Sequence, residues 1–120
     1  MSDSHLIQLL DLVERKHLID QNNTWSQGSS TYLAEIRKEL DEVEEVVGSN
    51  KTIQLEEELG DVLWDYLNLV RCLAQEETIT LDSVFQRAVG KFDERISGVE
   101  NGVTWKEIKQ LQKQRFEDQK

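Results

Sequence analysis

The stretch EEELGDVLWD, residues 56–65, places five carboxylates among apolar residues that keep a helical spacing. Leu59 and Val62 belong to an apolar stripe that continues past the quoted segment, as expected for a helix with one face in a core. Like charges three or four residues apart on a helix repel each other, so this concentration of acid needs an explanation. The surrounding residues 35–61 carry ten acidic and three basic side chains, which is −7 of the net charge of −10. Two interpretations are open: a solvated acidic face, or a cation site.

The rest of the chain is also helical in pattern. It has no proline and only six glycines among 120 residues, and no segment alternates with period two for long. We expect an all-α fold of four main helices and a short C-terminal helix, in a single domain covering residues 1–120. The first helix is expected at about 4–20, the second from a cap at Ser30 or Thr31 to Gly48, the third from a cap at Thr52 through Leu73, the fourth from Thr80 to Gly98, and the last after a Thr104–Glu107 capping box.

Each of the four main helices has an apolar stripe that is expected to face inward. The stripes are Leu6, Leu9, Leu10, Val13 and Leu18; Leu33, Ile36, Leu40, Val43 and Val47; Leu55, Leu59, Val62, Tyr66, Leu69, Val70 and Leu73; and Leu81, Val84, Phe85, Ala88, Val89, Phe92 and Ile96.

Two carboxylate pairs flank these stripes on the second and third helices. Glu39 and Glu42 are three residues apart, as are Glu58 and Asp61, so each pair lies on one side of its helix. The short connection predicts an antiparallel hairpin, which would bring the two flanks together if they face each other. Converging carboxylates need protons or cations, and oxygen ligands suit a hard ion, Mg²⁺ or Mn²⁺. Each pair alone is equally typical of an exposed helix. Glu35 and Asp65 extend the two rows, whereas Glu44, Glu45, Glu56 and Glu57 are expected to face solvent.

These motifs resemble those of the MazG-type nucleotide pyrophosphohydrolases of the all-α NTP pyrophosphatase superfamily. The segments are KELDE at 38–42, ELGD at 58–61 and, before them, the tryptophan-containing loop NTWSQGSS at 23–30. The resemblance covers about residues 20–97 and implies a MazG-like helical bundle assembled as a homo-oligomer, a dimer or a tetramer. It also implies hydrolysis of nucleoside triphosphates, often deoxynucleotides, to monophosphate and pyrophosphate. By this resemblance Glu39, Glu42, Glu58 and Asp61 are catalytic residues that bind Mg²⁺, with Mn²⁺ as a substitute, and Glu39 or Glu42 acts through water as general base.

The sequence departs from the family pattern at three points. Lys38 stands where the family often has the first of two adjacent glutamates, a position outside the metal quartet. The loop reads NTWS where MazG proper has CPWD, which leaves the nucleotide preference open. MazG proper also has two such domains, whereas one is expected here.

Several residues outside the quartet are candidates for substrate binding. Arg87, Lys91 and Arg95 recur every four residues and form one basic face on the fourth helix. The resemblance favours Lys91 as a catalytic phosphate contact and Arg95 as a second contact, and surface ion pairing is the alternative. Trp25 either plugs the bundle or stacks on a base, and the resemblance favours the nucleotide. Trp64 lies away from the apolar stripe of the third helix, which favours a second buried surface such as a subunit interface.

The overall charge and composition exclude several classes of function. A net charge of −10 argues against nucleic-acid or anionic-membrane partners. No apolar run is long enough for a transmembrane helix, and the first residues do not read as a secretory signal. Cys72 is the single cysteine, so an internal disulfide is excluded, which fits a cytoplasmic location.

The sequence therefore predicts a Mg²⁺-dependent pyrophosphohydrolase that removes unwanted nucleotides from the cell. A related enzyme acting on dUTP or phosphoribosyl-ATP is one alternative. A non-catalytic acidic helical oligomer that binds a basic partner is the other.

Overall fold

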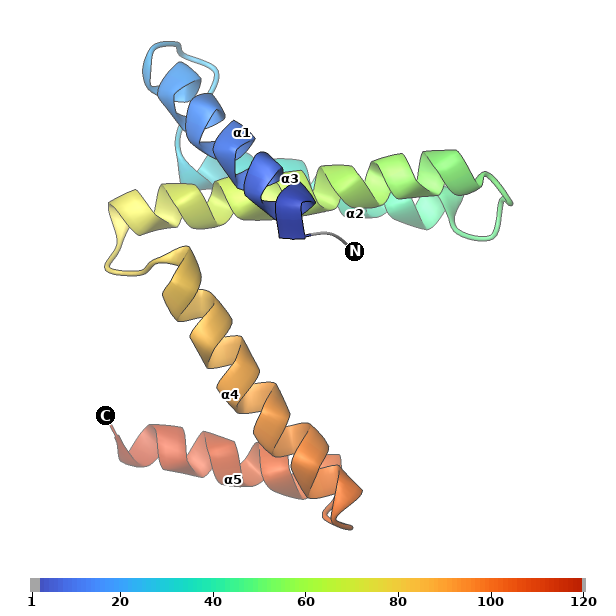
Figure 1. Cartoon of the computed structure of the whole chain (residues 1–120), viewed down its shortest axis with the longest axis vertical. Helices are drawn as coiled ribbons and strands as arrows, with labels where there is room; N and C mark the ends of the chain where they lie inside the picture. The colour runs from blue at the N-terminus through green and yellow to red at the C-terminus, as the bar shows by residue number, and fades with distance from the viewer. Residues whose placement is uncertain (1–2, 120) are drawn as a thin grey trace. The chain divides into compact units, whose positions relative to one another are not determined.

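The computed structural model describes residues 3–119 and confirms the all-α fold: five α-helices and, within these residues, no strand. Figure 1 shows the helices in chain order. The chain forms two compact units, residues 1–80 and 81–120, which are described separately. The helices are α1 (Asp3–Gln21), α2 (Ser29–Val46) and α3 (Thr52–Glu76) in the first unit, and α4 (Leu81–Glu100) and α5 (Trp105–Asp118) in the second.

In the first unit, α2 and α3 form the predicted antiparallel hairpin, joined by residues 47–51 (Figure 1). Helix α1 packs across α3. Two polar contacts hold α1 in place: the Arg71 guanidinium donates to both carboxylate oxygens of Glu14, and the His17 ring is 2.6 Å from the Gln75 amide oxygen. The Arg71 guanidinium also lowers the pKa of Glu14.

The start of α2 differs from the prediction. The predicted caps at Ser30 and Thr31 are wrong, because Gly28 occupies the N-cap position with φ +88°. The end of α3 supplies the missing acceptor: Glu76 accepts from the Ser29 amide at 2.9 Å and from its hydroxyl at 2.7 Å. An anion at a helix N-terminus satisfies unpaired amides and complements the helix dipole. The cap predicted at Thr52 is also displaced, since Lys51 is the N-cap of α3 and makes no side-chain cap bond.

The second unit is a helical hairpin of α4 and α5. The predicted capping box of α5 is confirmed, with the Thr104 hydroxyl accepting from the Glu107 amide and the Glu107 carboxylate accepting from the Thr104 amide. Helix α4 continues two residues past Gly98, its predicted end. Gly98 faces Ile108 of α5 so closely that a Cβ atom there would overlap the isoleucine side chain.

Only part of the predicted apolar stripes is buried. The buried apolar side chains of the first unit are those of Val13, Tyr32, Val46, Leu67, Leu69, Val70 and Cys72. Several residues predicted to face inward are exposed, because within each unit a helix packs against only one or two others, and one of its apolar sides stays uncovered there. These exposed residues are Leu6, Leu18, Leu33, Leu40, Val47, Leu59, Tyr66, Phe85, Val89, Phe92 and Ile96.

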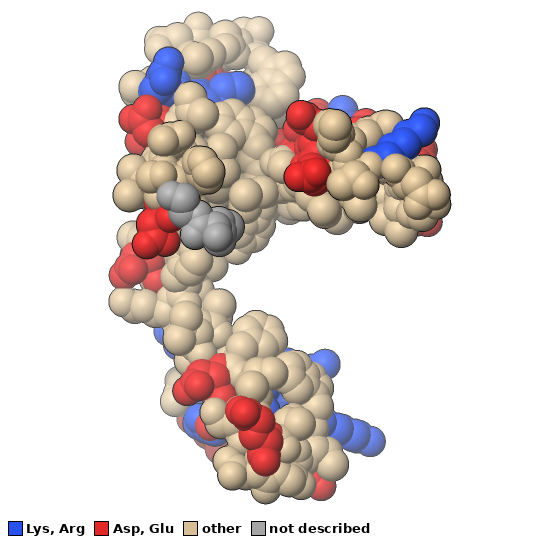
Figure 2. All heavy atoms as spheres, turned by 45° about the vertical axis from the view of Figure 1, so that its right-hand side comes forward, with Lys and Arg blue, Asp and Glu red and all other residues tan. Residues whose placement is uncertain are grey.

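Figure 2 shows acidic side chains covering part of the paired α2 and α3. The four glutamates that the sequence assigns to solvent, Glu44, Glu45, Glu56 and Glu57, are exposed, as predicted. Over the described residues, no helix combines the length and the apolar character that crossing a lipid bilayer requires.

Candidate metal and nucleotide site

Three carboxylates from two helices converge on the hairpin. Glu39 of α2 and Glu58 and Asp61 of α3 each offer an oxygen, and these oxygens all lie within 4.8 Å of one another. Because α2 and α3 pair as antiparallel neighbours, the acidic row of one helix lies beside the acidic row of the other. The spacing of three residues brings Glu58 and Asp61 to the same side of α3. The structure thus brings three of the four predicted ligands together.

Two of these three residues have a buried carboxylate oxygen without a partner. Glu39 Oε2 and Glu58 Oε2 have no hydrogen-bond partner among the described residues. A buried carboxylate oxygen without a partner destabilises the fold, and a bound ligand that supplies the partner offsets this cost. A hard divalent cation fits this set, because every donor is a carboxylate oxygen and the donors are close enough to share an ion.

The fourth predicted ligand, Glu42, lies beside the cluster. It is exposed, and it is not one of the three residues whose oxygens meet. Burial first, then the hydrogen bond and the charge of Glu42, raise the pKa of Glu39 to about 7. The hydrogen bond with Glu42, followed by burial, also raises the pKa of Glu58. Crowded carboxylates that resist ionisation are typical of metal and proton-transfer sites.

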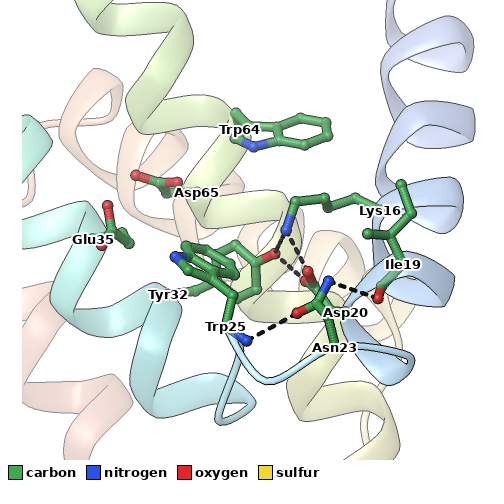
Figure 3. Close-up of a pocket in the computed structure, with 9 residues that line it drawn as sticks. All are labelled: Lys16, Ile19, Asp20, Asn23, Trp25, Tyr32, Glu35, Trp64 and Asp65. Atoms are coloured by element: carbon green, nitrogen blue, oxygen red, sulfur yellow. Dashed lines mark hydrogen bonds and ion pairs between the residues drawn. The ribbon is translucent and has the colours of Figure 1, made fainter.

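A pocket of about 420 Å³ opens in the same unit, between α1, α2 and α3 and the loop after α1. Trp25 and Trp64 contribute two indole rings to its wall, and Glu35 and Asp65 contribute carboxylates (Figure 3). The remaining lining residues are Lys16, Ile19, Asp20, Asn23 and Tyr32. Asp65 acts electrostatically on Glu39, so the pocket is close to the carboxylate cluster.

One end of the pocket has a closed polar network. The Lys16 ammonium donates to Asp20 and, at 3.1 Å, to the hydroxyl of Tyr32, which itself donates to Asp20. Burial and the Asp20 carboxylate raise the pKa of Tyr32, so its hydroxyl stays protonated. The Lys16 ammonium also lies 4.1 Å from the centre of the Trp25 ring.

Trp25 is held by hydrogen bonds of its loop and by a ring contact with the buried Tyr32. Its amide donates to the Asn23 side chain at 2.9 Å, and Asn23 donates back to the Ile19 carbonyl at 3.0 Å, which ties the loop to the end of α1. The Trp25 ring packs edge-on against Tyr32 at 5.6 Å and is 51% exposed. An indole that is fixed but half exposed at a pocket suits stacking on a planar ligand.

Asp65 stands at the other end of the pocket, near Glu35. In Figure 3 the two carboxylates turn toward each other, and Glu35 is paired with the Lys38 ammonium at 2.9 Å. Asp65 is 7% exposed, and its Oδ2 has no partner among the described residues. Burial, followed by the charges of Glu35 and Asp61, raises its pKa to about 6.

The predicted basic residues Lys91 and Arg95 lie in the second unit. With Arg87 they border a cavity of about 760 Å³ to which α5 also contributes. Lys91 is exposed, whereas Arg95 is buried, with Nε donating to Gln112 at 2.8 Å and the guanidinium 5.3 Å from the rings of Phe92 and Trp105.

Sequence reasoning missed most of the pocket. Lys16 and Asp20 are one helical turn apart on α1, but Tyr32 reaches them only because α1 and α2 both pack against α3, which no local spacing reveals. Trp64 lies in the pocket wall, and the second buried surface suggested for it, such as a subunit interface, stays a prediction. Asp65 carried a usable signal, because it continues the Glu58–Asp61 row by one helical turn.

Comparison with known protein families agrees with this geometry. Residues 27–99, more than half of the chain, match the model of the MazG nucleotide pyrophosphohydrolase domain. No curated protein and no solved structure matches the chain.

Proposed function

Because the chain belongs to the MazG nucleotide pyrophosphohydrolase family, we propose that it hydrolyses nucleoside triphosphates, deoxynucleotides in particular, to monophosphate and pyrophosphate. The observation that carries the proposal is the convergence of Glu39, Glu58 and Asp61 close to a pocket with two indole rings in its wall. A cation held by carboxylates binds the phosphates of a nucleotide, and aromatic rings in a pocket wall stack on its base. Removal of unwanted nucleotides is the role that this reaction would serve.

Mg²⁺ is the proposed cofactor, with Mn²⁺ as a substitute. Glu39, Glu58 and Asp61 would hold it, and Glu42 lies close enough to join them. When bound, such an ion polarises the phosphate and makes a water easier to deprotonate. The unpaired oxygens of Glu39 and Glu58 support this assignment.

The chain's own residues then bind and orient the nucleotide. Trp25 stacks on the base, with Trp64 as a further wall that helps to exclude water. When it does not itself bind the ion, Glu42 takes the proton of the attacking water, because it is exposed and lies outside the three-oxygen cluster. Such a reaction needs no nucleophilic side chain, in agreement with the raised pKa of the buried Cys72 thiol.

For Lys91 and Arg95 the proposed phosphate contact rests on the family resemblance. Lys91 is the stronger candidate of the two. Its side chain is exposed, whereas the Arg95 guanidinium is buried against aromatic rings and bonded to Gln112.

We also propose a homo-oligomer, a dimer or a tetramer, in the cytoplasm. Apolar side chains that a single chain leaves open support the assembly, among them Ile53 at 77% and Val89 at 67% exposure. The single free cysteine, Cys72, is compatible with a reducing compartment.

A product assay tests the proposal. Each common NTP and dNTP, including dUTP, is incubated with the protein and Mg²⁺, and the products are separated by chromatography. Glu58→Gln removes one ligand charge, and Glu57→Gln is the matched control one residue away on the exposed side of α3. We expect monophosphate and pyrophosphate from the wild type and the control, and none from Glu58→Gln. No turnover, or diphosphate with phosphate, would refute the proposal.

A further inference from the structure

Asp65 is a buried carboxylate that the proposed mechanism does not use. Its side chain is 7% exposed, it borders the pocket, and its Oδ2 has no hydrogen-bond partner in the described part of the chain. Lys38 acts on it electrostatically but is bonded to Glu35. Asp65 is also not one of the three residues whose oxygens meet in the carboxylate cluster. An unpaired acceptor of this kind indicates that a hydrogen-bond donor of a ligand belongs there.

The position of Asp65 along the hairpin indicates which part of a nucleotide it meets. Asp65 follows Asp61 by one helical turn, about 6 Å along the axis, and Glu35 precedes Glu39 by the same step. Because α2 and α3 are antiparallel, both steps lead in the same direction from the carboxylate cluster. Tyr32, which packs against the Trp25 ring, is about 10 Å along the axis from Glu39. The order along the axis is therefore the carboxylate cluster, then Asp65, then the Trp25 ring.

A nucleotide has the same order of parts, with phosphates, sugar and base in sequence. With the phosphates at the cluster and the base at Trp25, the sugar comes level with Asp65. We propose that Asp65 accepts a hydrogen bond from a sugar hydroxyl of the bound nucleotide, the 3′-hydroxyl in a deoxynucleotide. This inference rests on the proposed function and adds a residue that recognises the sugar of the substrate.

The chemistry of the site favours a hydroxyl donor. An ionised carboxylate only accepts hydrogen bonds, and its bond to a hydroxyl is stronger than one between neutral groups. Glu35 forms an ion pair with Lys38, whereas the Asp65 carboxylate has an oxygen free to accept a hydrogen bond from a ligand. A substrate without the hydroxyl would leave Asp65 buried and unpaired, and sites built to bind a hydroxyl reject such analogues.

The test compares the best deoxynucleotide of the product assay with its 2′,3′-dideoxy analogue, both with Mg²⁺. We measure kcat/KM for the two substrates with the wild type, Asp65→Ala and Asp65→Asn. Asp41→Asn, a change at an exposed position on α2, is the matched control. Thermal melting of each variant establishes that it is folded, and Asp65→Asn preserves the side-chain shape if alanine disturbs the packing.

We expect the wild type and the control to prefer the deoxynucleotide by about tenfold to a hundredfold, the value of a hydrogen bond to a charged group. The ratio of the two kcat/KM values should fall toward one in Asp65→Ala. In Asp65→Asn it should lie between the wild-type ratio and the Asp65→Ala ratio. A wild-type ratio near one, or a ratio that Asp65→Ala leaves unchanged, overturns the inference while the proposed function stands. An absence of turnover with every nucleotide overturns the proposed function, and the sugar contact with it.

Discussion

Replacing Asp65 by asparagine should make the metal-free protein more stable. Asp65 is 7% exposed and has an unpaired oxygen, and its pKa is raised from 3.8 to about 6. Between these two values the folded protein binds a proton that the unfolded chain has lost, so its stability falls as the pH rises. Above pH 6 the loss is complete. Asparagine has nearly the same shape and no charge, so it removes this loss.

The pKa difference sets the magnitude. At about 1.4 kcal/mol per pH unit, the rise from 3.8 to about 6 corresponds to a ceiling of about 3 kcal/mol at pH 7.5. The amide must still find partners in the same space, so we expect a gain of about 1–2 kcal/mol. For a unit of this size that is a rise of about 5–15 °C in melting midpoint. At pH 5 the gain should be about half as large, because part of the folded-state proton is still bound.

Thermal melting of the wild type and Asp65→Asn in EDTA, at pH 7.5 and pH 5, measures both quantities. Asp41→Asn provides the control for removing one acidic charge from an exposed helix position. A variant that is less stable than the wild type at pH 7.5 would refute the reasoning. A gain of the same size at both pH values would show that the cause is not the Asp65 charge.

Three further predictions follow from other contacts. Mg²⁺ in place of EDTA should raise the melting midpoint of the wild type and of Glu57→Gln by several degrees but leave Glu58→Gln unchanged, and a shift common to all three would argue against the carboxylate cluster. Glu76→Gln weakens the N-terminal cap of α2 and should lower the unfolding free energy by about 1 kcal/mol in urea titrations; an unchanged value would mean that solvent caps the helix equally well. Gly98→Ala places a methyl group against Ile108 and should destabilise the second unit by about 1 kcal/mol, although alanine favours a helix; a higher melting midpoint would contradict the close packing.

The helices and the carboxylate rows were predictable because both depend on local spacing. A period of 3.6 residues identifies the helices, and a separation of three residues pairs Glu58 with Asp61 wherever the helix lies. The short connection then fixed α2 and α3 as an antiparallel hairpin. The local capping box of α5 was predictable for the same reason.

The features that were mispredicted depend on residues distant in the sequence. The cap of α2 comes from Glu76, 47 residues after Ser29, so no local motif could reveal it. The predicted stripes on α2 and α4 contain no buried residue, and Tyr32 and Val46 are buried on α2 instead. Whether Leu40 or Val89 is covered depends on which surfaces meet it. The pocket was missed because its polar network joins Lys16 to Tyr32 across two helices.

The unpaired oxygens are concentrated in one region. Glu39 Oε2, Glu58 Oε2 and Asp65 Oδ2 are the buried side-chain oxygens without partners in the described residues, and all three belong to the α2–α3 hairpin. Each opposes folding in the absence of ligand, whereas the contacts that anchor this hairpin to α1, such as Arg71 with Glu14, are satisfied. A protein that pairs its other buried polar groups and leaves these three open keeps them for a ligand.

Because a ligand that binds only the folded state stabilises it, a cation at the cluster and a hydroxyl at Asp65 should each recover part of this stability. The two gains should be additive if the ion and the sugar occupy separate positions, and melting the protein with Mg²⁺, with a nucleoside and with both measures that directly. A nucleoside gain that disappears when Asp65 is replaced by asparagine, while the Mg²⁺ gain remains, would assign the two ligands to the two carboxylate positions.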